Sequence, residues 1–301
     1  MANTSADWRT DTRSDARGFA QLCGHVGVLV VTGFSLVRWW STSWLAPLLL
    51  VHGFVFIFLF CADHECVHRT AFRSRRINDV VAAATGLLLV LPSRWFRLFH
   101  AAHHRYTQNS RKDPELDGWK PPSRAGIVLQ MSGLLYWKAM GKIIWNLARG
   151  RATASWMPTG HEKKAVREAR TMLAIYAAIA ALSISAQSWL VAKLWIVPAL
   201  VGQPFLRMYL LLEHTGCPVD QGTVVGTRTT LTNPVLRFFA WNMPFHREHH
   251  ARPQVPFHQL PTMHREWSTV GEGRNGVIDH GYVRTAIRLQ RARWRSAVSN
   301  S

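Results

Sequence analysis

Four long apolar runs alternate with polar segments along the chain. The first two cover residues 19–37 and 44–62, with a short polar turn between them, and the other two cover residues 171–186 and 194–212. A helix needs roughly 20 apolar residues to cross a hydrocarbon layer ~30 Å thick. The pattern therefore predicts an all-α integral membrane protein with four transmembrane helices arranged as two hairpins.

Two further segments have apolar character but do not fit a span. Residues 80–92 are too short to cross a membrane and suit an interfacial or re-entrant segment. Residues 125–148 mix apolar side chains with Lys138 and Lys142, which is typical of an amphipathic helix lying on a membrane. After Glu213 we expect no further span.

The same pattern predicts how the chain is divided. A polar tail, residues 1–18, precedes one membrane domain, residues 19–282, and a basic tail, residues 283–301, follows it. The basic tail has two equally good interpretations, which are a helix lying on the membrane and a disordered, solvated segment.

The distribution of charge predicts which way the spans face. The net charge is +19, and 33 of the 36 Lys and Arg residues lie in the termini and the long middle segment, on one side of the four spans. Cytoplasmic loops carry the excess of Lys and Arg, so we expect both termini and the middle segment in the cytoplasm. A basic surface there faces anionic headgroups and acidic proteins, and we expect no nucleic-acid partner.

Arg207 interrupts the apolar pattern of the last span. Exposing a charged side chain to lipid is costly. We therefore expect Arg207 to face protein or water.

Histidines are concentrated at three places on the expected cytoplasmic side, and one more follows the last span. HECVH begins at residue 64, HAAHH at residue 100 and HREHH at residue 246. The candidate metal ligands are His64, His68, His100, His103, His104, His214, His246, His249 and His250.

The spacing of these histidines predicts a metal centre. Side chains at i, i+3 and i+4 share one face of a helix, so each cluster directs two or three imidazoles toward the same point. Nine imidazoles exceed the roughly four ligands that one zinc ion takes, and we predict two metal ions. Imidazole binds iron, zinc, copper and nickel, so spacing alone does not select the metal. Solvated surface histidines are the alternative, and three such clusters on one side of a membrane argue against it.

Four carboxylates flank the histidines: Asp63, Glu65, Glu213 and Glu248. Metal-bound imidazoles usually donate their second N–H to a carboxylate or a carbonyl. We expect some of these four to orient the ligands. Simple solvated charge at helix ends is the alternative for each.

At these clusters the sequence resembles the membrane fatty acid desaturase and hydroxylase family. The segment from DHECVH to HAAHHRYT is similar to the first two histidine boxes of that family and the spacer between them. LLLEHTGCP resembles the end of its fourth span, and WNMPFHREHHARPQVPFHQLPTMH resembles its third box. The resemblance covers roughly residues 45–265.

The resemblance implies a four-span helical protein whose cytosolic helical cap holds two iron ions (Fe2+/Fe3+) and uses O2. It implies that the nine histidines named above are the iron ligands. It also implies electrons from outside, and the sequence has neither the HPGG motif of a fused cytochrome-b-type domain nor the cysteine cluster of a fused ferredoxin. We therefore expect a separate electron donor, such as a ferredoxin with its reductase.

The expected reaction is desaturation of an acyl chain in a lipid-like substrate that enters from the bilayer. Hydroxylation or a related oxidation of a lipid, a carotenoid or a specialised small metabolite is the alternative, because both reactions begin at an unactivated C–H bond. A histidine-rich metal transporter is a remote alternative. Transporter sites lie near the bilayer midplane on broken helices, whereas these histidines are expected beyond the ends of the spans.

Overall fold

A computed structural model of the chain describes residues 12–117, 123–151, 154–270 and 276–299. Most of these residues are helical, as the apolar pattern predicts. Within the described residues, four helical stretches are long and apolar enough to cross a membrane: Asp15–Arg38, Leu45–His68, Glu162–Ser185 and Ala192–His214. The prediction of a four-span, helical membrane protein is confirmed.

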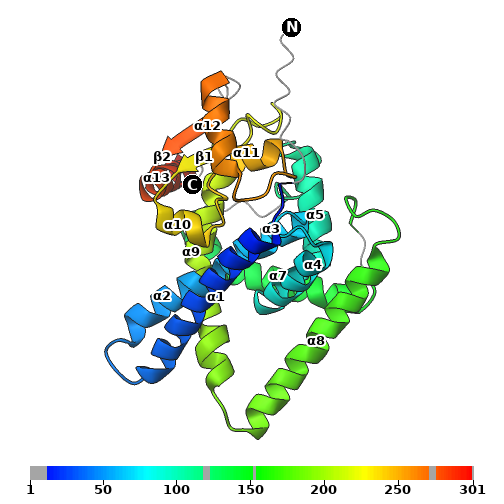
Figure 1. Cartoon of the computed structure of the whole chain (residues 1–301), viewed down its shortest axis with the longest axis vertical. Helices are drawn as coiled ribbons and strands as arrows, with labels where there is room; N and C mark the ends of the chain where they lie inside the picture. Colours follow the sequence, from blue (N-terminus) through cyan, green and yellow to red (C-terminus); the bar gives the residue numbers. More distant parts are fainter. Residues whose placement is uncertain (1–11, 118–122, 152–153, 271–275, 300–301) are drawn as a thin grey trace.

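The spans form two hairpins whose tips lie at the same end of the molecule. The first consists of α1 (Asp15–Arg38) followed by α2 (Leu45–Ile57) and α3 (Leu59–His68); the second consists of α8 (Glu162–Ser185) followed by a π-helical turn (Ala192–Ile196) and α9 (Val197–His214). Both tips point away from the part that carries helices α11 and α12 (Figure 1). The histidine-rich segments all lie at the end opposite the tips.

The helices are longer than the apolar runs. The expected span at residues 171–186 is part of α8, which begins at Glu162. In the same way α3 continues without a break through the first histidine cluster to His68. The first cluster therefore belongs to the spanning helix itself, because its polar residues continue the helix after the apolar positions end.

The expected short apolar segment at residues 80–92 is part of a sharply bent helix pair. Helices α4 (Arg75–Leu88) and α5 (Ser93–Tyr106) meet at an angle of 102°. Val90 has a φ of 55° in the connection, and Pro92 immediately precedes α5. The bend directs α5 back along α3, so that the second histidine cluster lies beside the first.

The expected single helix over residues 125–148 is wrong. Two helices, α6 (Arg124–Met131) and α7 (Leu134–Ala148), are separated at Gly133, which has a φ of 78°. A Cβ atom at Gly133 would lie 2.5 Å from the Cβ atom of Gln203 on α9. The chain can turn here because glycine, which has no Cβ atom, adopts a positive φ readily and allows this close approach.

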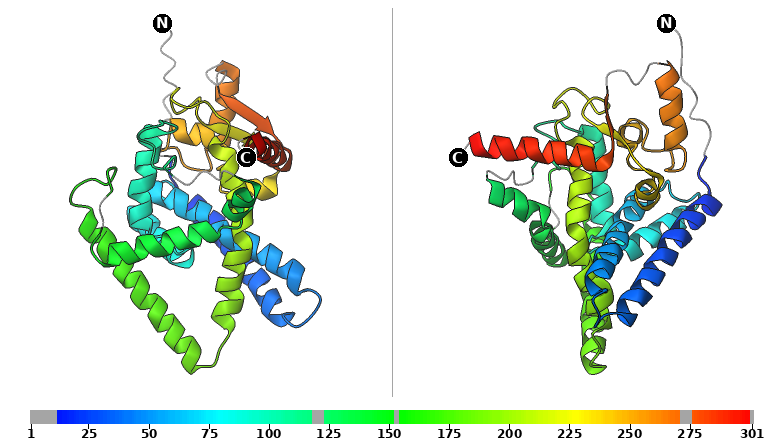
Figure 2. Two further views of the ribbon diagram at one scale, coloured as in Figure 1. Left: turned by 180° about the vertical axis from the view of Figure 1, so that it is seen from behind. Right: turned by 90° about the vertical axis from the view of Figure 1, so that its left-hand side faces the viewer.

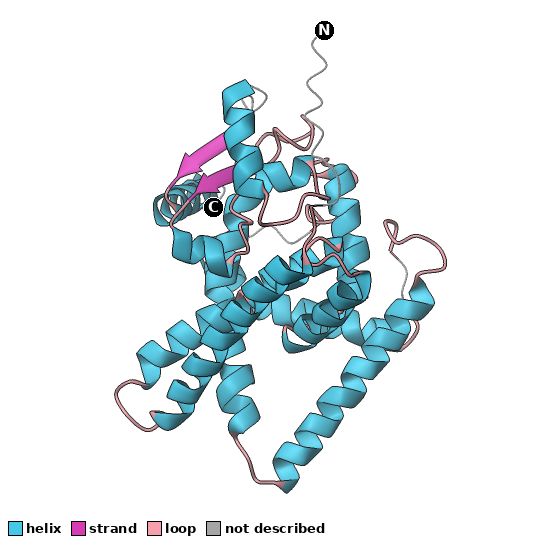
Figure 3. Ribbon diagram, in the orientation of Figure 1, coloured by secondary structure: helices cyan, strands magenta, loops and turns pink. Residues whose placement is uncertain are grey.

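The segment after α9 forms a small folded unit. It comprises β1 (Arg228–Leu231), α10 (Pro234–Phe239), α11 (His246–Ala251), α12 (Leu260–Val270), β2 (Val277–His280) and α13 (Tyr282–Ser299). β1 and β2 pair in parallel, with Arg228 opposite Val277. The apolar pattern did not predict this pair, which Figure 3 shows beside α12 and α13.

Helix α13 packs on the end of the last span. Its Ala286 and Leu289 are buried against Leu211 and Leu212 of α9. Figure 2 shows α13 lying across α9, above α6 and α7. Of the two interpretations of the basic tail, the disordered one is wrong for residues 283–299, and residues 300–301 lie outside the described residues.

Two histidines within the spans hold the helices together. His25 Nε2 on α1 lies 2.8 Å from the carbonyl oxygen of Val55 on α2, and His52 contacts both Thr32 Oγ1 on α1 and the carbonyl of Leu194. Such interhelical hydrogen bonds replace the water that a bilayer does not supply.

Candidate metal centre

The first cluster lies in the last turns of α3. His64 and His68 are four residues apart and therefore share a face of the helix. The helix ends at Arg69, which adopts a left-handed conformation and whose side chain pairs with Asp79. This cap fixes the end of α3 where it carries the two imidazoles.

Helix α5 carries the second cluster and is tied to α3 at its first residue. The hydroxyl group of Ser93 donates a hydrogen bond to Asp63 Oδ1 over 3.0 Å, and Thr85 donates to the same oxygen. The α5 cluster consequently lies against α3, with His100 Nε2 3.2 Å from His64 Nε2.

The third cluster lies on the short helix α11, which is anchored by Glu248. This buried carboxylate accepts hydrogen bonds from Thr229 of β1, His264 of α12 and Arg247. Burial opposes ionisation of Glu248, but these donors outweigh it and hold its pKa below the ordinary value. Glu248 therefore fixes α11 to its neighbours.

All nine candidate histidines meet in one cluster with two parts, in which six of them are buried and three are half-buried. In the first part the ligand atoms of five imidazoles lie within 4.8 Å of one another, and in the second part those of three do so. The first group is His64, His68, His100, His104 and His249, and the second group is His103, His214 and His250. His246 joins the second group, because its Nε2 lies 3.2 Å from that of His214 and 3.0 Å from that of His250.

The donor chemistry of the second group fits a cation. His103 Nδ1 lies 2.9 Å from Asp113 Oδ1 and His214 Nδ1 lies 3.0 Å from the carbonyl oxygen of Gly226, so both nitrogens carry the proton. His250 Nδ1 lies 3.0 Å from Thr107 Oγ1, whose own proton goes to a backbone carbonyl. In the neutral form each imidazole therefore presents an unprotonated Nε2 to the others. Lone pairs that face one another are stabilised by a metal ion between them.

The third cluster is suited to metal binding at neutral pH. Burial lowers the pKa of His246, His249 and His250 well below the ordinary value, and the neighbouring imidazoles lower it further. Imidazole binds metals in its neutral form. These three side chains are therefore in the binding form without a change in protonation.

The four carboxylates expected to orient the histidines lie in different places. Glu213 is 3.6 Å from His246 Nδ1. Asp63 bonds to hydroxyls of α4 and α5, Glu65 accepts from Thr70 and from the N–H of Phe257, and Glu248 anchors α11.

Two other carboxylates contact the cluster and were missed in the sequence. Asp113 accepts from His103, and Glu115 lies 3.6 Å from the same Nδ1. Hydrogen bonds from His103 and from backbone N–H groups outweigh the effect of burial and keep the pKa of Asp113 below its ordinary value. Both residues follow α5 in an irregular loop, where no periodic pattern indicates a direction.

A cavity of about 620 Å³ opens onto the histidines. Its wall includes His64, His100, His103 and His246. Much of the rest is aromatic or aliphatic, from α3, α5, α7 and α9: Phe60, Trp95, Phe96, Phe99, Tyr136 and Leu210. The cavity can place an apolar molecule beside the imidazoles.

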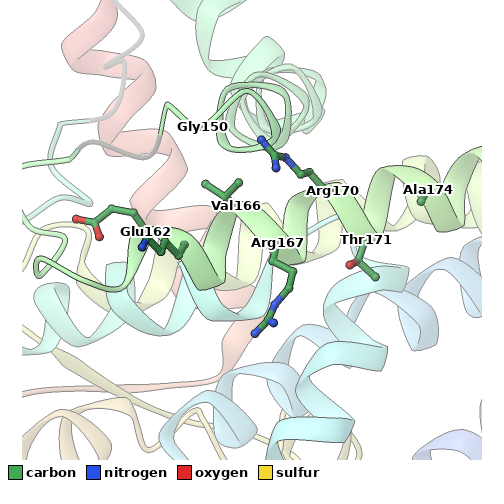
Figure 4. Close-up of a pocket in the computed structure, with 8 residues that line it drawn as sticks. Gly150, Glu162, Val166, Arg167, Arg170, Thr171 and Ala174 are labelled. Atoms are coloured by element: carbon green, nitrogen blue, oxygen red, sulfur yellow. The ribbon is translucent and has the colours of Figure 1, made fainter.

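A second hollow, of about 690 Å³, lies on the surface where α8 begins (Figure 4). Gly150, Arg167 and Arg170 are among the residues that line it, and none of the nine histidines is. It is separate from the cluster, and its basic side chains are exposed.

Comparison with known proteins gives a consistent result. The model of the family described as "Fatty acid desaturase" matches residues 12–280. An sn-1 oleoyl-lipid 12-desaturase of Picosynechococcus sp. is 28% identical over 181 residues, which are 57% of this chain and 51% of that protein. A protein of the same description from Arthrospira platensis is 24% identical over 79% of this chain and 70% of its own length. An sn-1 acyl-lipid omega-3 desaturase (ferredoxin) of Nostoc sp. is 27% identical over 31% of this chain and 26% of its own.

Proposed function

The chain belongs to the fatty acid desaturase family of oxidoreductases, and on that premise we propose that it is an O2-dependent di-iron enzyme that introduces a double bond into an acyl chain. The substrate is lipid-like. The chain spans about half the length of the first relative, and the activities printed for the relatives are carried over here as part of the proposal.

The division of the imidazoles into two adjacent groups carries the proposal. One group has five imidazoles and the other has three, with His246 as a fourth. A single ion does not use nine imidazoles, whereas two ions do. In this proposal the first group holds one iron and the second group, with His246, holds the other.

The chain's own residues position this centre. Bound iron would supply the activation of O2 and the removal of hydrogen from an unactivated C–H bond. Asp113 and the carbonyl of Gly226 fix the tautomers of His103 and His214, and Glu213 lies against His246. Burial of the cluster excludes bulk water, which suppresses side reactions of a reactive centre.

The cavity supports an acyl chain as the substrate. Its aromatic and aliphatic wall favours a hydrocarbon through burial of apolar surface. The same wall brings that hydrocarbon against His64, His100 and His103. A histidine-rich transporter is not supported, because the cluster lies at the ends of the spans and the chain belongs to a family of oxidoreductases.

We also propose that the termini and the histidine cluster face the cytoplasm, and that electrons come from a separate ferredoxin. The excess of Lys and Arg on that side supports the orientation, and the ferredoxin in the description of the Nostoc relative supports the donor. Labelling from outside of cysteines introduced at Thr42 and Ser188, in the two hairpin tips, tests the orientation; labelling from inside alone contradicts it.

Product analysis tests the reaction. Iron-loaded protein is incubated with O2, reduced ferredoxin and an acyl lipid, and the acyl chains are analysed by mass spectrometry. Loss of two hydrogen atoms is expected. Gain of one oxygen atom without that loss would replace desaturation by hydroxylation.

A further inference from the structure

Arg207 lies in the wall of the cavity beside the histidine cluster. It is on α9, seven residues before His214. Seven residues are two helical turns, so the two side chains share a face of α9 and lie about 10 Å apart along its axis. The sequence led us to expect that this cation faces protein or water, and it faces both the protein and the cavity.

The guanidinium group is held on one edge and left open on the other. Its Nε donates to Gln203 Oε1 over 3.1 Å, and its carbon lies 4.6 Å from the ring centre of Tyr136. Among the residues that the structure describes, no carboxylate comes within 4.0 Å, and the two terminal amino groups donate to none of them. Four of the five N–H donors of this side chain are therefore unfilled.

The acidic residues that line the cavity do not form an ion pair with Arg207. Glu213 lies 3.6 Å from His246 Nδ1, and Glu115 lies 3.6 Å from His103 Nδ1. Both carboxylates are near enough to interact with the charge of Arg207, but neither comes within 4.0 Å of its nitrogen atoms. A charged side chain without an ion pair inside a span is costly, which indicates that a bound group completes its surroundings.

We propose that Arg207 binds an oxyanion of the substrate, a carboxylate or a phosphate, while the apolar part lies along the aromatic wall toward the histidines. The two terminal amino groups present a fork that matches two oxygens of such a group. The inference rests on the proposed function, because it assigns the polar end of the same substrate. It goes beyond that function because it requires the substrate to carry a charged group within about 10 Å of the oxidised carbon, a distance that corresponds to two helical turns.

A purely structural role for Arg207 makes a different prediction. Tyr136 and Gln203 connect α7 and α9 through this side chain. If Arg207 only joins these helices, its replacement lowers the melting temperature and affects charged and neutral ligands alike. A purely structural role of Arg207 would not make the protein bind charged ligands more tightly than neutral ones.

Ligand binding, measured without turnover, tests the proposal. The full chain is purified in detergent, and the dissociation constants of palmitate, 1-palmitoyl-lysophosphatidate and 1-hexadecanol are measured by equilibrium dialysis. The neutral alcohol has the same chain length as the anions. We expect at least one anion to bind about tenfold more tightly than the alcohol, as a charge-assisted pair would give. Whichever anion shows the larger preference identifies the source of the oxyanion.

The variants separate the two roles. Arg207→Gln should abolish the preference for the anion and change the affinity for hexadecanol by no more than about twofold. Arg207→Lys should keep part of the preference, because it keeps the charge and loses the fork. Lys142→Gln, which removes an exposed cation of α7, should change nothing. Equal weakening for all three ligands in Arg207→Gln, or no preference in the wild type, overturns the proposal.

The test is independent of the proposed reaction. If the wild type prefers an anion and Arg207→Gln does not, Arg207 binds it whatever chemistry follows. If the anion preference is present but iron is absent or no oxidised product forms, the di-iron function fails and this inference stands. Should Arg207→Gln not fold, the wild type and Arg207→Lys still decide the result.

Discussion

At the scale of single residues, the orientation of the imidazoles depends on partners remote in sequence. The sequence identified all nine histidines that the structure brings together. It did not identify Asp113, Thr107 or the carbonyl of Gly226, which fix three of the tautomers. Histidine spacing is a local property of helices, whereas these partners become neighbours only when loops between the helices have folded.

Replacing Asp113 by Asn tests the role of this carboxylate. The variant keeps the shape but weakens the charge-assisted hydrogen bond to His103, so iron affinity should fall roughly 10–100-fold. Iron retained against a graded series of chelator concentrations measures the effect. Glu266→Gln, which alters an exposed carboxylate of α12, is the control and should match the wild type. Unchanged retention in Asp113→Asn would show that His103 does not need this partner.

The buried histidines predict how stability depends on pH in the metal-free protein. The pKa of His246, His249 and His250 is lowered by folding, so the unfolded chain binds more protons than the folded chain once the pH falls below about 6.5. The contribution of these imidazoles to the free energy of unfolding should therefore fall on acidification, by up to about 1.4 kcal/mol per pH unit for each. Melting temperatures of the apo protein between pH 7.5 and pH 5.5 check this, and a melting temperature that rises on acidification contradicts it.

At the scale of helices and strands, the apolar pattern predicted the spans. It did not predict the helix break at a glycine or the pairing of two strands that are distant in the sequence. The run at residues 19–37 lies within α1. The run at residues 44–62 begins at Trp44, the N-cap of α2, and continues through α2 into α3. The break at Gly133 depends on contact with Gln203, which no local pattern contains. The parallel pairing of β1 with β2 joins segments more than forty residues apart and is likewise non-local.

The close crossing of α2 and α9 should be sensitive to a single methyl group. Gly53 and Gly202 face each other, and a Cβ atom at Gly202 would overlap the backbone carbonyl of Gly53. Small residues let membrane helices approach this closely. Gly202→Ala should therefore cost about 1–3 kcal/mol, because backbone atoms must move apart. Thermal unfolding in detergent measures the loss.

Gly27→Ala is the matched control for this crossing. Gly27 lies in α1 with nothing within 4 Å of an added Cβ atom, so the substitution should be neutral or slightly stabilising. Equal melting temperatures for Gly202→Ala and Gly27→Ala would show that the helices have room to separate.

At the scale of the whole molecule, the excess of Lys and Arg on one side of the spans could be predicted from the sequence, because it depends only on the order of the spans. The histidine-bearing helices α5 and α11 lie at the end of the molecule opposite the hairpin tips (Figure 1). In the sequence, 33 of the 36 Lys and Arg residues lie in the segments that the order of the four expected spans assigns to one side. The cavity beside the cluster was not predictable, since seven helices and three connecting segments contribute to its wall.

The basic end predicts how the enzyme responds to salt with an acidic ferredoxin as donor. Long-range attraction between unlike charges speeds association and is screened as ionic strength rises. Turnover at limiting ferredoxin should fall several-fold between about 50 and 200 mM salt. A small neutral reductant provides the control and should give the same rate at both concentrations. Equal ferredoxin-dependent rates at both concentrations would exclude electrostatic recognition by this surface.

The central claim is that two groups of histidines hold two iron ions. Elemental analysis of the detergent-purified protein, beside a variant that combines His103→Ala and His249→Ala, tests it most directly, because each substitution removes a ligand from a different group. The account predicts about two irons per chain in the wild type and loss of both in the variant. Zinc alone at about one per chain, or no bound metal after aerobic loading with iron, would contradict it.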